Sequence, residues 1–369
     1  MRLRELTNML LGCFFLAFYH QAVAVEPPPI YGSPRLDQPR VLDWPADLPP
    51  LVPDLSEPTA NGANCVHASF ADCDIALSTA GNYHMALRDL WYDIYLPALG
   101  DLNVKNWMYT TSPPISPEQI VNKHVGIGNF RSQCVPQVAV GPNGLMNRLR
   151  GINPVGLDLT DGSDPVPIVR NRGNVILVKK GNPKNIHTIW DLGRDNVRVV
   201  TSNPDTEPGS FGNYSSSIFN IAYYNPQGAP AGATPEKLFN RIFNNHLRVS
   251  PVPGKWLAGS RIHHREVPWS IAFGHADAGL LFYHLARHAV QTFPHRFEIV
   301  PLGGTVRDPQ PLQGNRVATL FAARISGLQA PGGHWTWTQH EAANRLIRAF
   351  RSTQFKNILE SKGLQQPPL

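Results

Sequence analysis

The chain has 369 residues, of which 42% are hydrophobic and 16% are charged, and its formal net charge is +6. This apolar fraction can support packed cores and excludes a disordered chain, and the length suits two lobes. Only four cysteines occur, which excludes a disulfide framework, while 35 prolines and 30 glycines indicate many loops and turns. The basic residues are scattered rather than clustered, so we expect no nucleic-acid partner.

Residues 1–24 have the pattern of an export signal. Arg2 and Arg4 precede an apolar stretch from Met9 to Tyr19, and Ala22-Val23-Ala24 supplies small residues for cleavage. Leu10-Leu11-Gly12-Cys13 resembles a lipoprotein box, but the apolar run continues beyond the cysteine, which favours cleavage near residue 24. We therefore expect export to the periplasm without a lipid anchor.

Three cysteines remain after such cleavage. Cys65 and Cys73 are close in the sequence, and an oxidising compartment allows a disulfide between them. The third, Cys134, is then predicted to be a buried apolar thiol.

From residue 25 to 73 the chain is rich in proline, which is typical of a linker or an extended surface arm. From residue 74 onward, short apolar strands alternate with helical segments, which indicates an α/β fold with largely parallel sheets. Strands are expected at 75–77, 104–109, 138–140, 174–180, 197–200, 278–283 and 297–301. Helices are expected over 83–94, after caps at Ser116 and Thr234, over 265–274 and over 337–359, with a glycine-rich turn at 207–212.

Hydroxyl or glycine residues stand at several of the expected turns from strand to helix. Ligands of open α/β sheets bind beyond the carboxyl ends of the strands, where helix N-termini offer free N–H groups to an anion. Taken singly, such residues are more often ordinary helix caps. If the four turns converge on one point, their hydroxyl and N–H groups would together bind a small anion. The four turns contain Ser78 and Thr79, Thr111 and Ser112, Gly209 and Ser210, and His264 and Arg265.

The order of these turns resembles the extracytoplasmic substrate-binding proteins of ABC transporters, in the molybdate, tungstate and sulfate branch with the type II periplasmic binding fold. The resemblance covers residues 74–365 and is carried by Asn174-Val-Ile-Leu-Val-Lys-Lys-Gly-Asn-Pro-Lys184 and by Gly274-His-Ala-Asp-Ala-Gly279. It implies a monomeric, non-enzymatic protein without a cofactor, which encloses its ligand between two lobes and delivers it to a membrane permease. Lobe 1 would comprise 74–175 and 299–369, and lobe 2 would comprise 176–298, with crossovers near 172–180 and 297–303.

The resemblance also implies which residues bind the ligand. It assigns hydrogen bonds to the anion from the hydroxyl, backbone and side-chain groups of Ser78, Thr79, Thr111, Ser112, Gly209, Ser210, His264 and Arg265. The family's tyrosine falls on Phe282 here, so the adjacent Tyr283 is the candidate. Glu207 and Glu266 lie in turns that should donate hydrogen bonds, and their carboxylates would repel a dianion. Arg265 can pair either with the ligand or with Glu266.

Several other functions remain open at this point. The ligand can be an oxyanion, such as molybdate, tungstate, sulfate or phosphate, or a small organic acid. His263 and His264, with His84 and Glu266, form an alternative zinc-type metal site. A ligand sensor with the same fold is a further alternative. A hydrolase is disfavoured because the chain lacks a Gly-x-Ser-x-Gly motif.

Overall fold

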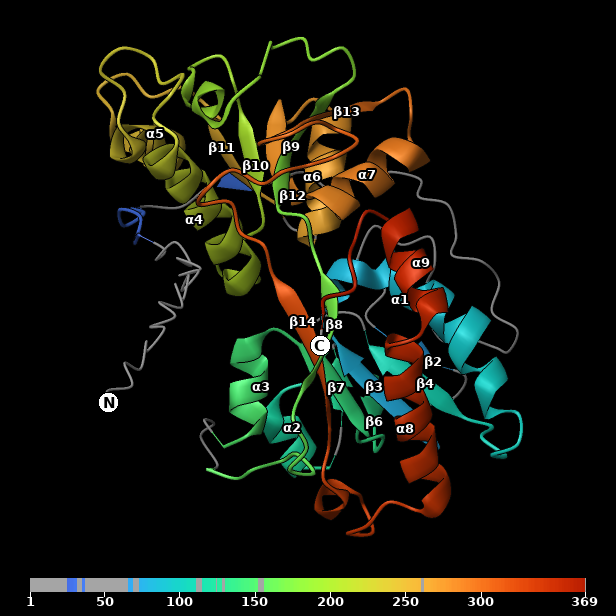
Figure 1. The fold of residues 1–369 in the computed structure, drawn as a ribbon. Coiled ribbons are helices and arrows are strands. Elements are labelled where there is room, and N and C mark those ends of the chain that lie inside the picture. The colour runs from blue at the N-terminus through green and yellow to red at the C-terminus, as the bar shows by residue number, and fades with distance from the viewer. Residues whose placement is uncertain are drawn as a thin grey trace, which may run out of the picture.

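The computed structural model describes residues 25–31, 35–36, 66–68, 73–110, 115–123, 125–127, 130–151, 156–259 and 262–368. These residues form two lobes, each a sheet flanked by helices, which lie one above the other in Figure 1. Among the described residues, no helix is long and apolar enough to cross a membrane. The predicted export signal and the lipoprotein box lie outside the described residues and stay predictions.

Lobe 1 is built on a six-stranded sheet in the order β2-β4-β3-β7-β14-β8. Alternate residues of β3 face opposite sides of this sheet: Ile75 and Leu77 pack under α1, α8 and α9, while Ala76 faces α2 and α3. The sheet is therefore covered by helices on both faces. Its strands are β2 (Val66–Ala68), β3 (Ile75–Thr79), β4 (Trp107–Thr110), β7 (Val138–Gly141), β8 (Val166–Arg170) and β14 (Thr319–Arg324), with a separate pair β5 (Val125–Ile127) and β6 (Phe130–Ser132). Its helices are α1 (His84–Leu90), α2 (Pro117–Val121), α3 (Asn143–Leu149), α8 (Trp337–Phe350) and α9 (Thr353–Ser361).

Lobe 2 is built on a second six-stranded sheet in the order β1-β11-β10-β12-β9-β13. One continuous apolar core joins this sheet to its helices. Its strands are β1 (Arg35–Leu36), β9 (Asn174–Lys179), β10 (Val199–Thr201), β11 (Trp256–Ala258), β12 (Ala278–Phe282) and β13 (Phe297–Val300). Its helices are α4 (Pro208–Tyr224), α5 (Pro235–Phe243), α6 (His263–Ala272) and α7 (Tyr283–Thr292), with the short turn of helix η4 (Ile189–Gly193) beside them.

The predicted fold class is confirmed: the chain is α/β and two-lobed, with helices flanking each sheet. The sheets are mixed, however, rather than mostly parallel. In lobe 1, β3 runs parallel to β4 and β7, while β14 runs antiparallel to β7 and β8. The antiparallel pairs form where a strand enters its sheet from the other lobe, so its direction is not set by a local crossover helix.

From β3 onward, the chain passes between the lobes at residues 171–173 and again between β13 and β14. β1 and β2 also lie in different lobes, and residues 37–65 between them lie outside the described residues. The two crossing segments are bonded to each other, because the backbone N–H of Asn174 donates to Asn315 Oδ1 at 2.7 Å and Asn315 Nδ2 donates to the Asn174 carbonyl at 2.8 Å. Gly173 lies between them with a φ of +78°, and a Cβ atom there would be 2.8 Å from Pro311 Cγ. This close approach requires a glycine at the hinge.

Several predicted elements have different bounds. The predicted glycine-rich turn at 207–212 is mostly the first turn and a half of α4, which begins at Pro208 and tolerates the two glycines. The strand predicted over 278–283 ends at Phe282, where α7 begins without a sequence signal. The capping box that starts at Ser116 is confirmed, and so is the Thr234 cap of α5.

The disulfide prediction was wrong. Cys73 is bonded to Cys134, 61 positions away, rather than to Cys65, which lies outside the described residues. Cys73 precedes β3 and Cys134 precedes β7, and these strands are parallel neighbours. Their starting ends therefore meet, and Cys134 is a buried half-cystine rather than a thiol.

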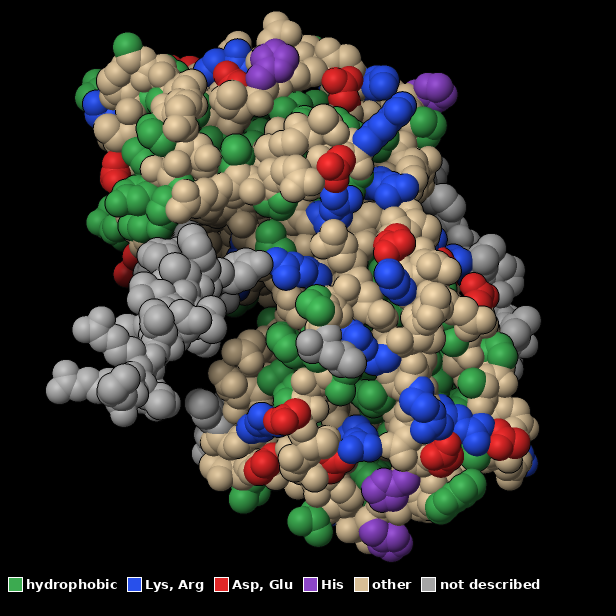
Figure 2. All heavy atoms as spheres, in the orientation of Figure 1, with side chains coloured by type: hydrophobic (Ala, Val, Ile, Leu, Met, Phe, Trp, Pro, Cys, Tyr) green, Lys and Arg blue, Asp and Glu red, His purple; other side chains and the backbone are tan. Residues whose placement is uncertain are grey.

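The described part of the N-terminal arm lies on lobe 2. The backbone N–H of Val25 donates to Asn220 Oδ1 at 2.8 Å, and the Asn244 side chain bonds the Pro29 carbonyl and the Tyr31 N–H. Basic and acidic side chains are intermingled on the face shown in Figure 2. This face has no extended area of one charge of the kind that nucleic-acid binding requires.

Candidate functional site

A cavity of about 390 Å³ lies between the two lobes. It is bordered by the residues that follow β3 and β7, by the first turns of α4, α6 and α7, and by the segment that enters β14. These are carboxyl ends of strands and N-termini of helices, the usual ligand position in open α/β sheets. The lining residues are Ala80, Asn82, Pro142, Glu207, Gly209, Ser210, Asn213, Tyr214, Ile262, His263, His264, Phe282, Leu285, Arg316, Ala318 and Leu320.

A larger cavity of about 740 Å³ lies on the outer side of lobe 2. Only lobe 2 and Tyr31 of the arm line it, so closing the lobes would not change it. Three of its arginines are ion-paired: Arg194 with Asp191, and both Arg241 and Arg248 with Asp195. We therefore take the cavity between the lobes as the candidate site.

Ser78 and Thr79 are completely buried at the end of β3 and do not line the cavity. Ser78 Oγ accepts the backbone N–H of Ile115 at 2.7 Å, and Thr79 Oγ1 is hydrogen-bonded to the Tyr83 hydroxyl at 2.7 Å. Their hydroxyls hold the neighbouring loops in place, and Ala80 and Asn82 line the cavity beside them. Of the second predicted turn, Thr111 and Ser112 lie outside the described residues.

The first turn of α4 contributes Gly209 and Ser210 to the lining, as the sequence predicts for the third turn. Asn213 follows on the same face of the helix at the i, i+3 spacing from Ser210. Its side chain is 8% exposed and has no hydrogen-bond partner among the described residues. The amide of Asn213 is therefore available to a ligand.

Glu207 immediately precedes α4 and lines the same cavity. Its Oε2 accepts the backbone N–H of His263, the first residue of α6, at 2.8 Å, and its Oε1 is 3.4 Å from Ser210 Oγ. Burial raises the pKa of the Glu207 carboxyl from 4.5 to about 7, although the His263 N–H opposes this shift. A carboxylate of the protein thus occupies the N-terminus of α6, where the family pattern places the ligand anion.

Of the two residues predicted in the fourth turn, only one lines the cavity. His264 lines the cavity, whereas Arg265 is 7% exposed and does not. Glu266 is fully buried outside the lining, accepts a hydrogen bond from Ser270 Oγ at 2.6 Å, and packs against Gly259, where a Cβ would clash. Glu266 is therefore a structural carboxylate rather than a group that faces the ligand.

His264 and His84 bring the lobes into contact beside the cavity. The His264 ring in α6 stacks on the His84 ring of lobe 1, with centroids 5.2 Å apart, and the His288 ring meets His84 edge-on at 5.6 Å. His284 of α7 also bonds the Asn82 carbonyl of lobe 1. Burial lowers the pKa values of His284 and His288 to about 4, so these two rings are neutral at pH 7.

Tyr283 is buried in the first turn of α7 and does not line the cavity. Its ring packs against Gly363, where an added Cβ would lie 2.8 Å from the ring. The preceding residue, Phe282, does line the cavity and packs on Tyr214, whose ring stacks on His263 at 3.7 Å. An aromatic floor thus occupies the place where the family pattern has a tyrosine hydroxyl.

Arg316 contributes a positive charge to the cavity, and sequence reasoning missed it. Its guanidinium has no hydrogen-bond or ion-pair partner in the part of the chain that the structure describes. Arg316 is one of two exposed arginines, with Arg307, in a connection rich in proline and glycine, so no local pattern marks it. Only the path of the chain into β14 brings it to the cavity.

The structure gives no support to the metal site. Within the described ranges, no group of three or more His, Cys, Asp or Glu side chains is arranged to hold a metal ion. Both ring nitrogens of His263 are engaged: Nδ1 accepts the Ser202 N–H at 3.0 Å, and Nε2 lies 2.7 Å from the Leu280 carbonyl, to which it donates. His263 therefore has no lone pair to offer a metal.

The described residues thus form two lobes joined by crossing segments, with a cavity between the lobes at the carboxyl ends of the strands. Residues 150–365 match the family model of the bacterial extracellular solute-binding proteins, and the chain belongs to that family. No curated protein matches the sequence significantly.

Several solved structures of binding proteins are similar to this chain at low sequence identity. AgtB from A. tumefaciens R10, solved in complex with agropinic acid, is 15% identical, with a TM-score of 0.50 over 80% of this chain and 83% of that one. The molybdate-binding protein of Azotobacter vinelandii is 12% identical, with a TM-score of 0.46 over 80% of this chain and all of that one. The sulfate-binding protein SubI from Mycobacterium tuberculosis H37Rv is 15% identical, with a TM-score of 0.46 over 80% and 86% of the two chains.

Proposed function

We propose that this protein captures a small anionic solute between its two lobes in the periplasm and presents it, as a monomer, to an ABC-type permease. The observation that carries the proposal is Arg316, an unpaired guanidinium in a cavity between the lobes. A guanidinium binds a carboxylate or phosphate through two parallel hydrogen bonds. Residues of the first turns of α4 and α6 line the same cavity.

In this proposal, closure of the lobes completes the contacts that stabilise the bound solute. The cavity takes residues from lobe 1, from lobe 2 and from the segment that enters β14, so only a closed form completes the contacts with a solute. The hinge at Gly173 and the paired crossing segments allow the lobes to rotate as units. Ser78 and Thr79 act indirectly, by holding the loop that carries Ala80 and Asn82.

The volume fits a small solute. A cavity of about 390 Å³ is near the lower end of the roughly 300–1,000 Å³ that small-molecule sites occupy. The candidate solutes are tetrahedral oxyanions, namely molybdate, tungstate, sulfate and phosphate, and small organic acids. Each provides the negative group that Arg316 can bind.

The test is a thermal-shift screen of the purified protein against these anions and zinc, followed by titration calorimetry of each anion that stabilises it. We expect at least one anion to bind and the Arg316→Gln variant to bind it at least tenfold more weakly. Arg307→Gln is the matched control, since Arg307 is exposed in the same connection but outside the cavity. Stabilisation by zinc alone, or equal affinities in both variants, would overturn the proposal.

A further inference from the structure

The polar groups of the cavity between the lobes differ in whether they donate or accept hydrogen bonds. Arg316 only donates hydrogen bonds, and the Asn213 amide both donates and accepts. Glu207, when ionised, only accepts, and one of its oxygens is already used by the His263 N–H at 2.8 Å. Its remaining lone pairs need donors, and Ser210 Oγ at 3.4 Å is the single side-chain donor near it in the described structure.

A fully ionised tetrahedral oxyanion offers acceptors alone. In this cavity such an anion meets the Glu207 carboxylate at the N-terminus of α6, so the backbone donor that would stabilise the anion is already taken. Two negative groups in one small cavity repel each other, most strongly when closure of the lobes excludes water. The geometry therefore penalises sulfate and molybdate when Glu207 is ionised, that is, above its raised pKa of about 7.

An organic acid with its own hydrogen-bond donor fits the same groups. Its acidic group can face Arg316, while a hydroxyl or ammonium group donates to Glu207 and uses the lone pairs that are otherwise left without a donor. Tyr214 and Phe282, whose rings pack together, line the same cavity and provide an apolar surface for the carbon chain of the acid. A tetrahedral oxyanion has no such chain.

We propose that Glu207 determines the specificity of this site, by admitting small organic acids that carry a hydroxyl or ammonium donor and by excluding fully ionised oxyanions. This inference rests on the proposed function, because it takes the cavity to be the solute site and narrows the class of solute. In this inference, Glu207 accepts a hydrogen bond from the solute, whereas Arg316 donates hydrogen bonds to its acidic group.

The test uses pairs of acids that differ by one donor group: L-malate with succinate, and L-glutamate with glutarate, beside sulfate and molybdate. Calorimetry of the full mature protein at pH 8, where Glu207 is ionised, should show at least one donor-bearing acid binding at least tenfold more tightly than its partner, with neither oxyanion competing at equal concentration. Glu207→Gln should reduce that ratio at least fivefold and improve sulfate binding, because an amide can donate to an anion. Glutamine keeps an acceptor for the His263 N–H, so the variant is expected to fold.

Glu236→Gln is the matched control, because Glu236 is an exposed glutamate in the first turn of α5, away from the cavity. Circular dichroism and the melting temperature check that both variants are folded. The inference is overturned when an oxyanion binds more tightly than the organic acids, or when Glu207→Gln leaves the ratio within each pair unchanged. If no anion of the panel binds the wild-type protein, the proposed function fails instead, which separates the two outcomes.

Discussion

The Oε2 atom of Glu207 accepts the backbone N–H of His263 at 2.8 Å, across 56 positions of sequence. This bond joins the residue before α4 to the first residue of α6, so the N-termini of two helices face one carboxyl group. A negative charge at these positions is stabilised by the helix dipoles. Burial acts in the opposite direction and dominates, since it raises the pKa of Glu207 to about 7.

The raised pKa of Glu207 makes stability depend on pH in a defined direction. Between pH 4.5 and about 7 the native state binds more protons at Glu207 than the unfolded chain does, so the free energy of unfolding contributed by this residue falls as pH rises. Glu207→Gln does not titrate. Urea unfolding at pH 5 and pH 8 should show the variant gaining stability relative to wild type at the higher pH. A variant that loses stability relative to wild type between pH 5 and pH 8 would contradict the raised pKa of Glu207.

The α/β class and seven of the fourteen described strands follow from the sequence, because these buried strands are short apolar runs with clear turn signals. β9 and β12 are of this kind, and they pair in register from Ala278 with Val178 to Phe282 with Asn174. The direction in which β14 enters its sheet is set by contacts between distant segments. No local pattern encodes it, and the disulfide partner of Cys73 escaped prediction for the same reason.

Some residues that line the candidate site were predicted from the sequence and others were not, and the difference has a physical reason. Turns at helix N-termini can be located from sequence, and Gly209, Ser210 and His264 do line the cavity. Whether a hydroxyl faces a ligand or a neighbouring loop depends on tertiary contacts, such as the Ile115 N–H that Ser78 accepts. Arg316 lies outside any helix turn, so a search of helix starts does not find it.

Acid should destabilise the protein through His263. This histidine is 3% exposed, and burial lowers its pKa from 6.5 to about 4. Between these two values the unfolded chain binds the proton and the native state does not, so the free energy of unfolding falls as pH falls from 6.5 to 4. His263 alone contributes a loss of about 2 kcal/mol between pH 6.5 and pH 5.

Urea unfolding of wild type, His263→Gln and His246→Gln over this range measures the effect. Glutamine at 263 keeps an acceptor for the Ser202 N–H but does not titrate, so the loss on acidification should be smaller in that variant. His246 is exposed, and its replacement should leave the wild-type slope unchanged. Equal slopes for wild type and His263→Gln would show that this histidine does not carry the acid sensitivity.

Breaking the disulfide between Cys73 and Cys134 should destabilise lobe 1. The bond closes a loop across 61 positions, and the chain-entropy relation assigns about 4 kcal/mol to a loop of that length. Cys73→Ser with Cys134→Ser should lower the free energy of urea unfolding by about that amount, and dithiothreitol should do the same to wild type. Peptide mapping under non-reducing conditions must recover the 73–134 pair, and a 65–73 pair would contradict the structure.

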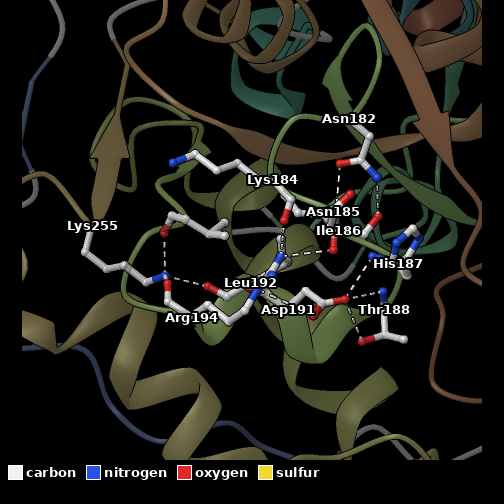
Figure 3. Close-up of polar contacts among 11 residues, drawn as sticks. Asn182, Lys184, Asn185, Ile186, His187, Thr188, Asp191, Leu192, Arg194 and Lys255 are labelled. Carbon is white, nitrogen blue, oxygen red and sulfur yellow. Dashed lines mark hydrogen bonds and ion pairs between the residues drawn. The ribbon is translucent and has the colours of Figure 1, made fainter.

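Lys255 supports lobe 2 from inside. Its side chain is 2% exposed, and Nζ donates to the carbonyls of Leu192, Arg194 and Val197 at 2.6, 2.6 and 2.5 Å (Figure 3). The ammonium group thus satisfies three backbone acceptors where η4 ends. In the same close-up, Asp191 accepts the backbone N–H groups of His187 and Thr188, each at 2.8 Å, which fixes the start of η4.

Replacing this ammonium group by a methyl thioether should destabilise the protein without weakening solute binding. Lys255→Met keeps the side-chain volume but removes the shared donor of three carbonyls, of which only that of Arg194 keeps another in the described part of the chain, the Val197 N–H at 3.1 Å. We therefore expect a loss of about 3 kcal/mol in the free energy of unfolding. Lys237→Met is the control, because the exposed Lys237 donates to one carbonyl, that of Gly232, and its loss should cost less than about 1 kcal/mol. Urea unfolding measures the loss of free energy of unfolding in each variant relative to wild type. Equal losses would show that the three hydrogen bonds of Lys255 stabilise the protein no more than the single surface bond of Lys237 does. Calorimetry with the solute that wild type binds should give the same affinity in both variants at a temperature where both are folded.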